Sequence, residues 1–201
     1  MNFKIVGNRS HIRLDEELAS VDKQVADAAF RIHKKEIVDP YMSARRFLKY
    51  KSNAYVRKNK IDLLEYIDFQ KEHSGSKTFT VNLAVMPLYI PHEYIVFGFS
   101  KRLGELICNH DIWWDFADET ICGKSMGNVK DAIESFAIPW FHKMGNEHYI
   151  TMQLIKQKLS AKMSNHNQEW LSTISDRRNR IAFIQENMDK LKLPKSLIDQ
   201  V

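Results

Sequence analysis

The chain has 201 residues, of which 44% are hydrophobic and 27% are charged. This is the composition of an ordinary globular protein, and it excludes a disordered or fibrous chain. A chain of this length can bury a core without a disulfide or a structural metal. The formal net charge of +5 at pH 7 leaves both nucleic-acid and protein partners open.

The sequence predicts no segment that directs the protein to a membrane. The N-terminal residues lack an apolar stretch of signal-peptide length. The longest nearly apolar run, from Leu83 to Ile90, is broken by Pro87 and is too short to span a bilayer. The two cysteines, Cys108 and Cys122, have no metal-like spacing, which favours reduced thiols. We therefore expect a cytoplasmic protein without membrane contact.

The first predicted element is an amphipathic helix over residues 14–37. Its apolar residues recur at three- and four-residue steps, and they are Leu14, Leu18, Val21, Val25, Ala28, Ala29 and Ile32. The pair Asp39-Pro40 predicts the end of this helix, because proline restricts the preceding residue and donates no backbone hydrogen bond. A helix or loop is expected at Phe47 and Leu48, and a short strand at residues 53–58.

A β-hairpin is the clearest local prediction. Residues 78–85 alternate strictly between apolar and polar side chains, and they follow the β-like run 63–70 and a loop that contains Gly75. Period-two geometry buries Phe79, Val81 and Leu83 on one face. The opposite face then carries the polar residues Asp68, Gln70, Thr80 and Asn82. They form a candidate binding site for a polar ligand; the alternative is a solvated face, or one whose polar groups a helix or loop satisfies.

The remaining elements are mostly helical. Helices are expected over residues 99–109, 128–136 (ended by Pro139), 147–163 and 167–191, with a strand or aromatic loop at 111–116. The fold class predicted is α+β, a small antiparallel sheet covered by helices and followed by a helical C-terminal region. The predicted division is an α+β domain of residues 1–145 and a helical extension of residues 146–201. This extension packs either on that domain or on a second protomer.

Motifs for catalysis and metal binding are weak in this chain. The string Gly75-Ser76-Lys77-Thr78 lacks the glycine spacing of a phosphate-binding loop and joins two strands. The neighbours Cys108, His110 and Asp111 gain little from adjacency, because the fold usually brings catalytic residues together from distant segments. None of the eight histidines forms an HxxxH pair. We predict no catalytic residue, metal or cofactor, and we favour a non-enzymatic protein over a small-ligand enzyme at the hairpin face.

A basic cluster lies between residues 41 and 60, where no acidic residue occurs. Its members are Arg45, Arg46, Lys49, Lys51, Arg57, Lys58 and Lys60. Aromatic residues are interleaved with these cations, a pattern that suits phosphate contacts together with base stacking. The alternative is the ordinary basic coat of an exposed segment, paired with acidic residues elsewhere in the fold. Nucleic acid is therefore the second candidate partner.

An acidic and aromatic stretch forms a candidate surface for a protein partner. It contains Asp111, Trp113, Trp114, Asp115, Asp118 and Glu119. Adjacent residues in a strand point to opposite faces, so one tryptophan of the pair can be exposed as an interaction hot spot. The C-terminal helices carry apolar stripes and the basic residues Arg177, Arg178 and Arg180. We expect them to dock on the domain or, slightly favoured, in a two-fold homodimer.

Several short strings occur in the order found in one known family. They are Asn53–Lys58, Ile67–Lys71 followed by Phe79–Leu83, Arg102–Leu106 before the tryptophan pair, and Ile138–Phe141. Residues of about 25–143 thus resemble the bacterial family filed as domain of unknown function 4304, although Glu72 replaces its usual serine. The resemblance implies an α+β domain without assigned catalytic residues. By analogy, it also implies an immunity-type or defence-associated accessory protein.

Overall fold

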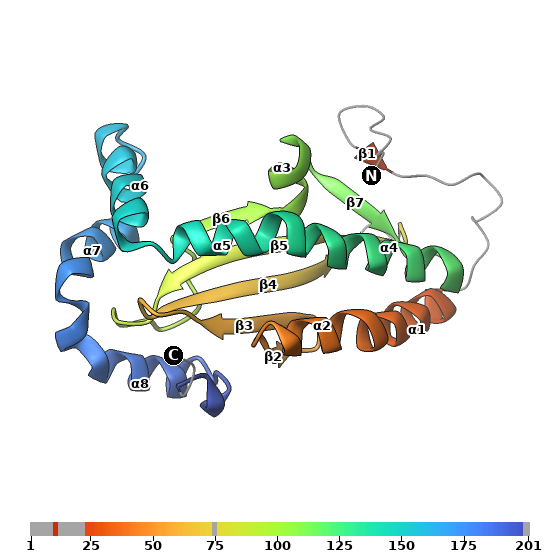
Figure 1. The fold of residues 1–201 in the computed structure, drawn as a ribbon, viewed down its shortest axis with the longest axis horizontal. Coiled ribbons are helices and arrows are strands. Elements are labelled where there is room, and N and C mark those ends of the chain that lie inside the picture. Colours follow the sequence, from red (N-terminus) through yellow and green to blue (C-terminus); the bar gives the residue numbers. More distant parts are fainter. Residues whose placement is uncertain (1–9, 12–22, 74–75, 199–201) are drawn as a thin grey trace. The chain divides into compact units, whose positions relative to one another are not determined.

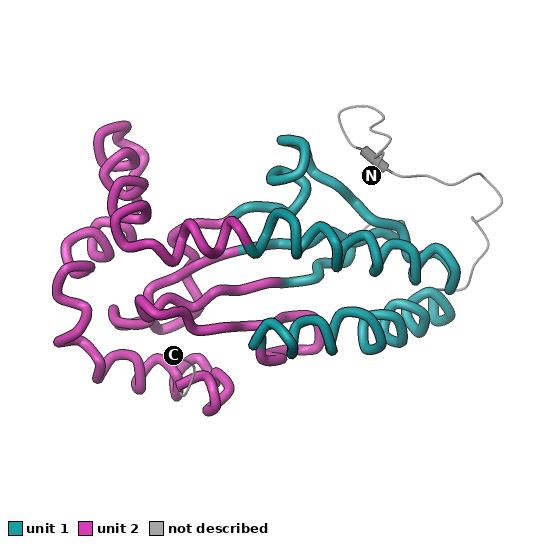
Figure 2. Tube along the Cα trace, in the orientation of Figure 1, with its two compact units in different colours: residues 1–47, 68–83, 101–138 teal, residues 48–67, 84–100, 139–201 magenta. Residues whose placement is uncertain are grey.

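The computed structural model describes residues 10–11, 23–73 and 76–198, which form an antiparallel sheet and helices (Figure 1). The predicted α+β class is therefore confirmed. Contacts divide the chain into two compact units (Figure 2). Unit 1 comprises residues 1–47, 68–83 and 101–138, and unit 2 comprises residues 48–67, 84–100 and 139–201.

The strands follow the order β1-β7-β5-β4-β3-β2, and β6 pairs with β5. β2 and β3 pair antiparallel, as do β5 and β7, whereas β1 runs parallel to β7. The bounds are β1 Ser10–His11, β2 Leu48–Lys51, β3 Ala54–Lys58, β4 Leu63–Lys71, β5 Thr78–Pro87, β6 Phe99–Arg102 and β7 Ile112–Asp115. The hairpin and the strand at 53–58 are confirmed. Leu48 opens a strand that the sequence did not predict, and residues 99–102 form β6 rather than the first turn of a helix.

Unit 1 has an aromatic core. Phe30 of α1 (Lys23–His33) contacts Phe79 of β5 and Phe116, with ring centroids 5.2 Å apart in both pairs. Phe79 also contacts Trp114 at 6.0 Å. These four rings, on a helix and on neighbouring strands, fix α1 on the sheet through large buried apolar surfaces. The alternation in β5 therefore predicts the correct buried residues.

The predicted buried face of the first helix is wrong. Val25 and Ile32 are 56% and 49% exposed, and Ala29 is buried as predicted, but together with Ala26 and Phe30 rather than with Val25 and Ile32. Both sets recur at helical spacing, and the two stripes differ by a small rotation about the helix axis. Phe30 decides between them, because its aromatic side chain buries far more surface than valine. Residues 14–22 of the predicted helix lie outside the described residues.

Pro40 does not end the first helix, contrary to the prediction. α1 continues through a π-helical segment, η2 (Lys34–Val38), into α2 (Asp39–Ala44). The N–H of Asp39 donates to the carbonyl of Lys34, five residues earlier. This wider turn leaves room for the proline ring, which then occupies the first turn of α2, where a missing N–H costs no helical hydrogen bond.

Pro139 repeats the same arrangement. α4 (Glu119–Ala132) passes through the π-helical segment η3 (Ile133–Ala137) into α5 (Ile138–Met144). Ile138 donates its N–H to the carbonyl of Ile133. The sequence predicted a helix end here too, so both errors have one cause: a π turn admits a proline that a regular α-helix would exclude.

The helix pair of unit 1 is joined by a polar clamp at Glu134 of η3. Tyr41 of α2 donates its hydroxyl to Oε2 of Glu134 at 2.6 Å, and Arg45 forms an ion pair with the other carboxylate oxygen. Burial, followed by the contact with Glu134, raises the pKa of Tyr41 above its usual value. The clamp therefore lies where the two helices with π segments run side by side in unit 1 (Figure 1).

The C-terminal helices of unit 2 pack on the segment that follows β5. Asn187 is fully buried and donates from its side-chain amide to the carbonyls of Leu88 and Ile90 at 2.8 and 2.6 Å. Its Oδ1 accepts the N–H of His92 at 2.9 Å. One side chain thus satisfies three buried backbone groups, which would otherwise carry a large desolvation penalty.

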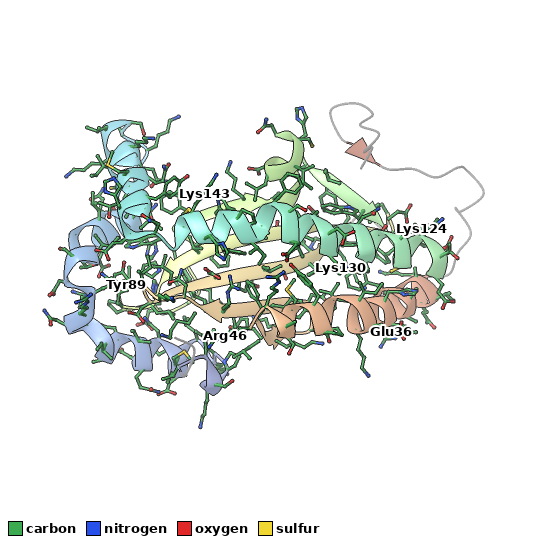
Figure 3. All side chains as sticks on the ribbon, in the orientation of Figure 1. Glu36, Arg46, Tyr89, Lys124, Lys130 and Lys143 are labelled. Atoms are coloured by element: carbon green, nitrogen blue, oxygen red, sulfur yellow. The ribbon has the colours of Figure 1, made fainter. Side chains whose placement is uncertain are left out.

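A tryptophan makes the second attachment of these helices. Trp170 is buried and donates its indole N–H to the hydroxyl of Tyr89, labelled in Figure 3, at 2.6 Å. A Cβ on Gly98 would lie 2.3 Å from the Trp170 ring, so only glycine fits beneath it. Asn167 donates to the carbonyl of Gly98 at 3.0 Å. The helices are α6 (Glu147–Leu159), α7 (Asn165–Thr173) and α8 (Ile181–Lys190), with the 3₁₀ segments η4 (Ile174–Arg180) and η5 (Lys195–Leu197).

The single helix predicted over 167–191 is therefore two helices joined by a 3₁₀ segment. Ile181, expected on the inward stripe, is 65% exposed at the start of α8. The residues of the preceding 3₁₀ segment advance by three per turn, which shifts the stripe that follows. The remaining described helix is α3 (Leu103–Cys108). The domain boundary at residue 145 and the homodimer stay predictions.

α8 ends in a Schellman motif with a lysine at the position that usually holds glycine. Lys192 has φ 53°, Leu193 donates its N–H to Met188, and Lys192 donates to Asp189. A side chain in this left-handed conformation costs about 1 kcal/mol relative to glycine, and a cation near the helix C-terminus recovers only part of it.

We predict that Asn187→Ala lowers the free energy of unfolding by about 3–5 kcal/mol, because three buried backbone groups lose their partner. Urea denaturation at neutral pH measures the loss. Asn179→Ala is the matched control, since Asn179 is an exposed asparagine bonded to Asp176, and it should change stability by less than about 0.5 kcal/mol. A loss below about 1 kcal/mol for Asn187→Ala would contradict this account.

We predict a loss of stability in acid through His166. Its ring centroid lies 5.2 Å from that of His92, and burial, followed by this neighbour, lowers the pKa of His166 from 6.5 to about 4. The folded state therefore disfavours the protonated imidazole, and the unfolded state binds more protons between these two values. Stability is complete above the unfolded pKa and falls as the pH drops through this window.

His166→Phe tests this pH dependence, because Nε2 of His166 has no hydrogen-bond partner among the described residues and the substitution loses no bond there. The free energy of unfolding of the variant should fall less steeply between neutral pH and pH of about 4.5 than that of the wild type. His148→Phe, at an exposed position on α6, should retain the wild-type slope. Identical slopes for His166→Phe and the wild type would refute the prediction.

We predict that Lys192→Gly stabilises the protein by up to about 1 kcal/mol, because glycine adopts the left-handed conformation without steric cost. The urea midpoint measures the change. Asn109→Gly, at the left-handed C-cap of α3, should be close to neutral, because asparagine tolerates that conformation. A loss of stability in Lys192→Gly would show that the lysine side chain makes a favourable contact in the fold.

Candidate binding surfaces

The polar face of the hairpin is brought together, but its groups bind one another. Asn82 donates to Oε1 of Gln70 at 2.8 Å and lies 3.5 Å from Oδ2 of Asp68. All three are half-buried. Thr80 is fully buried, and its hydroxyl has no partner among the described residues. These residues form a polar row within unit 1, and their use as a ligand site stays a prediction.

The basic cluster is partly neutralised by acidic side chains. Arg57 contacts Glu65 at 2.7 Å, Lys58 contacts Asp62 at 3.3 Å, and Arg45 pairs with Glu134 as described above. Burial raises the pKa of the Glu65 carboxyl, and the Arg57 guanidinium opposes this shift. The other cations of the cluster are exposed, and they are Arg46 (labelled in Figure 3), Lys49, Lys51 and Lys60.

The acidic residues near β7 mostly serve the local fold. Oδ1 of Asp115 accepts the N–H of Ala117 at 2.7 Å, and burial raises the pKa of this carboxyl. Asp118 is the N-cap of α4 and accepts the N–H of Ile121 at 2.8 Å. Both carboxylates satisfy backbone donors at a turn and at a helix start. Glu119 is exposed in the first turn of α4.

The tryptophan pair divides between core and surface, as strand geometry predicts. Trp114 is 1% exposed and packs on Phe79, whereas Trp113 is half-buried on the other face of β7. The Arg102 guanidinium lies 5.4 Å from the Trp113 ring centroid and forms an ion pair with Asp111. Of the predicted partner surface, Trp113 thus remains, together with Arg102 and the carboxylate of Asp111 beside it.

Neither cysteine is activated by its surroundings. The Cys108 sulfur contacts the backbone carbonyls of Gly104 and His110 rather than an imidazole. Burial raises the pKa of the Cys122 thiol to about 12. Among the described residues, no cluster of three or more histidine, cysteine or carboxylate side chains could hold a metal ion. In the same part of the chain, no helix is long and apolar enough to cross a membrane.

α6 has apolar residues on two opposite sides. Asn146 caps its N-terminus by accepting the N–H of Tyr149 at 2.9 Å. Ile150 and Leu154, four residues apart, form the buried side. A second stripe at helical spacing is exposed, and we call it the α6 stripe: Tyr149 (37% exposed), Met152 (40%), Lys156 and Leu159 (82%). The two stripes lie on opposite sides of the helix, given 3.6 residues per turn.

A groove of about 470 Å³ lies where α6 leads into α7. Its lining residues are Lys158, Ala161, Met163, Gln168, Leu171 and Ser172. Lys156, Lys158 and Lys162 are exposed in this region, whereas Glu147, the acidic residue of α6, forms an ion pair with Arg177. The α6 stripe thus presents apolar side chains bordered by positive charge.

Sequence reasoning did not single out these residues. A signal was present, because residues 149–159 contain more apolar side chains than one buried stripe can use. The division between buried and exposed stripes depends on the packing of α7, which the local pattern does not contain. The basic residues predicted in the C-terminal helices differ in their contacts. Arg177 and Arg180 contact acidic residues, whereas Arg178 is exposed.

The family model of the domain of unknown function 4304 matches residues 38–143, just over half of the chain, and the protein belongs to this family. The predicted family is thus confirmed. A search of curated proteins found no match, and neither did a search of solved structures. The α6 stripe and its groove lie C-terminal to the matched residues.

Proposed function

We propose that this protein is a non-enzymatic protein-binding module whose α6 stripe and groove bind an acidic, amphipathic segment of another protein. The carrying observation is the exposed apolar stripe opposite the buried side of α6. Cytoplasmic location and an immunity-type or defence-associated role belong to the same proposal. In that role the surface would hold the protein that the module restrains or accompanies.

The apolar residues supply the affinity in this proposal. Full burial of a side chain such as leucine or methionine contributes about 1.5–3 kcal/mol. Leu159, at 82% exposed, and Met152 therefore provide an anchor of the size that dominates many interfaces. Amphipathic helices are commonly recognised through their apolar face in this way.

The charges around the stripe select the partner. Lys156, Lys158 and Lys162 are exposed, and Glu147 is occupied by Arg177. An acidic segment complements this surface and approaches it faster. A second copy of the chain, docked through the same stripe by a two-fold axis, would instead bring equal positive charges together. We therefore favour a different protein over the homodimer at this surface.

Site-specific photo-cross-linking tests the proposal. A photoreactive amino acid at Met152 or Leu159 should cross-link one partner in cells, whereas the same group at Ile181, which is exposed on α8, should not. The purified partner should then bind through a segment with acidic and large apolar residues. Cross-linking of the protein to itself at Met152 would favour the homodimer and contradict the proposal.

We predict that the double variant Met152→Glu and Leu159→Glu weakens binding of the purified partner by about 100-fold or more, since it removes two apolar anchors and repels acidic residues. Isothermal titration calorimetry measures this loss. Ile181→Glu, which adds a charge at an exposed apolar residue of another helix, should change the affinity by less than about twofold. Equal effects of the two variants would exclude the α6 stripe as the binding surface.

A further inference from the structure

β2 and the C-terminal end of α8 lie together in unit 2. Tyr50 of β2 donates its hydroxyl to the carbonyl of Leu191 at 2.8 Å. The Lys51 ammonium lies 5.1 Å from the Tyr50 ring centroid. Residues that are 141 positions apart in the chain are thus in contact. Lys192, which follows Leu191 in the chain, therefore lies near Lys51 of the strand.

Three lysines gather at this junction, and we call them the lysine patch. Lys51 is an exposed residue of β2, beside an irregularity in the strand register, and its ammonium lies next to the Tyr50 ring. Lys192 and Lys195 are exposed just after α8 and line a groove of about 550 Å³. Asp189 also lines this groove and accepts a hydrogen bond from Gln185. Among the described residues that line the groove, two are lysines and one is acidic.

The backbone at Lys192 adds a second observation. Its left-handed conformation is the one in which glycine is favoured, yet this position carries a cation that extends from the end of the helix. A residue that breaks a local structural preference without an evident gain in packing is often kept for function. Lys192 and Lys51 thus point to the same kind of partner, an extended polyanion.

We infer that the lysine patch binds the phosphate backbone of a nucleic acid, in addition to the protein-binding role of α6. Lysines that neutralise phosphates gain affinity by releasing counterions, without a need for apolar anchors. The large apolar side chain exposed beside the patch is Ile198, at 39%, which is little for a protein hot spot. A nucleic acid therefore fits this surface better than an acidic protein does.

The lysine patch differs in membership from the basic cluster predicted from the sequence. Arg45, Arg57 and Lys58 are engaged by carboxylates, and the distant residues Lys192 and Lys195 take their place. The surface is sequence-independent in its chemistry, because phosphate contacts carry no base information.

Fluorescence anisotropy with labelled oligonucleotides of about 20 nucleotides, as single-stranded DNA, single-stranded RNA and duplex DNA, tests the inference on the full chain. Three lysines that each neutralise one phosphate of a single strand weaken binding about 20-fold between about 50 mM and 200 mM salt. Absence of binding to all three probes at the lower salt concentration would overturn the inference. Equal binding of poly-glutamate at the same charge would also overturn it, in favour of an acidic protein.

Lys192→Gly is the informative variant, because it removes the charge while suiting the backbone. It should retain the fold, raise the thermal midpoint and make the slope of log affinity against log salt shallower by about 0.7. The triple variant Lys51→Glu, Lys192→Glu and Lys195→Glu should abolish binding. An unchanged slope in Lys192→Gly would exclude this lysine and overturn the inference.

Two controls match the changes made. Asn109→Gly introduces glycine at another left-handed position without altering charge, and Lys124→Ala removes an exposed cation from α4 (labelled in Figure 3). Both should keep the wild-type salt slope. The double variant Met152→Glu and Leu159→Glu should also keep it, so that failure of the protein-binding proposal and failure of this inference remain distinguishable. Loss of oligonucleotide binding in Lys124→Ala would place the nucleic acid elsewhere.

Discussion

The side-chain amide of Asn187 is the interaction on which the arrangement of unit 2 depends. Where β5 ends, the chain leaves the sheet while still buried, and the carbonyls of Leu88 and Ile90 have no strand to pair with. Asn187 accommodates both carbonyls with two N–H donors and accepts the N–H of His92 with its oxygen. Because buried backbone groups require partners, α8 is held where this amide can reach them.

Both proposed binding surfaces follow from that attachment. α8 brings Leu191 to Tyr50, and the lysines that follow Leu191 then lie near Lys51 of β2. α7 is fixed by Trp170 against Tyr89 and Gly98, and it in turn covers one side of α6. The opposite side of α6 keeps its apolar residues exposed. In both cases, one side of a helix or strand packs in the fold, and the side that stays exposed forms the proposed binding surface.

The sequence predicts the sheet better than it predicts the helices. Strict alternation of apolar and polar residues identifies β5 as a strand and places Phe79, Val81 and Leu83 on one face, although the other face is also buried apart from Asn82. α1 offers two stripes of similar quality, and the contact of Phe30 with Phe79 and Phe116, which is not local, selects between them. Pro40 and Pro139 mislead for a related reason, since the π turns that accommodate them leave no clear mark in the local pattern.

The candidate surfaces were predictable in part. The cations of β2 were visible as a cluster, but their neighbours Lys192 and Lys195 come from the far end of the chain. The carboxylates that neutralise Arg45 and Arg57 lie in other elements, so charge counting along the chain overstates the positive surface there. Strand periodicity correctly separated Trp113 from Trp114, whereas the roles of Asp115 and Asp118 required the turn and cap geometry.

Because of the two π segments, the alignment of the helix pair in unit 1 depends on how many residues each helix contains rather than on which residues they are. A π turn holds one residue more than an α turn, so a chain one residue shorter between positions 34 and 38 could wind as an uninterrupted α-helix. Such a deletion would leave the phase of Tyr41 and Arg45 unchanged, whereas a deletion in a neighbouring α turn would rotate them by about 100° away from Glu134. The clamp thus forms only when the two helices present Tyr41, Arg45 and Glu134 to one another. A single insertion or deletion in an α turn disturbs this alignment more than most substitutions would.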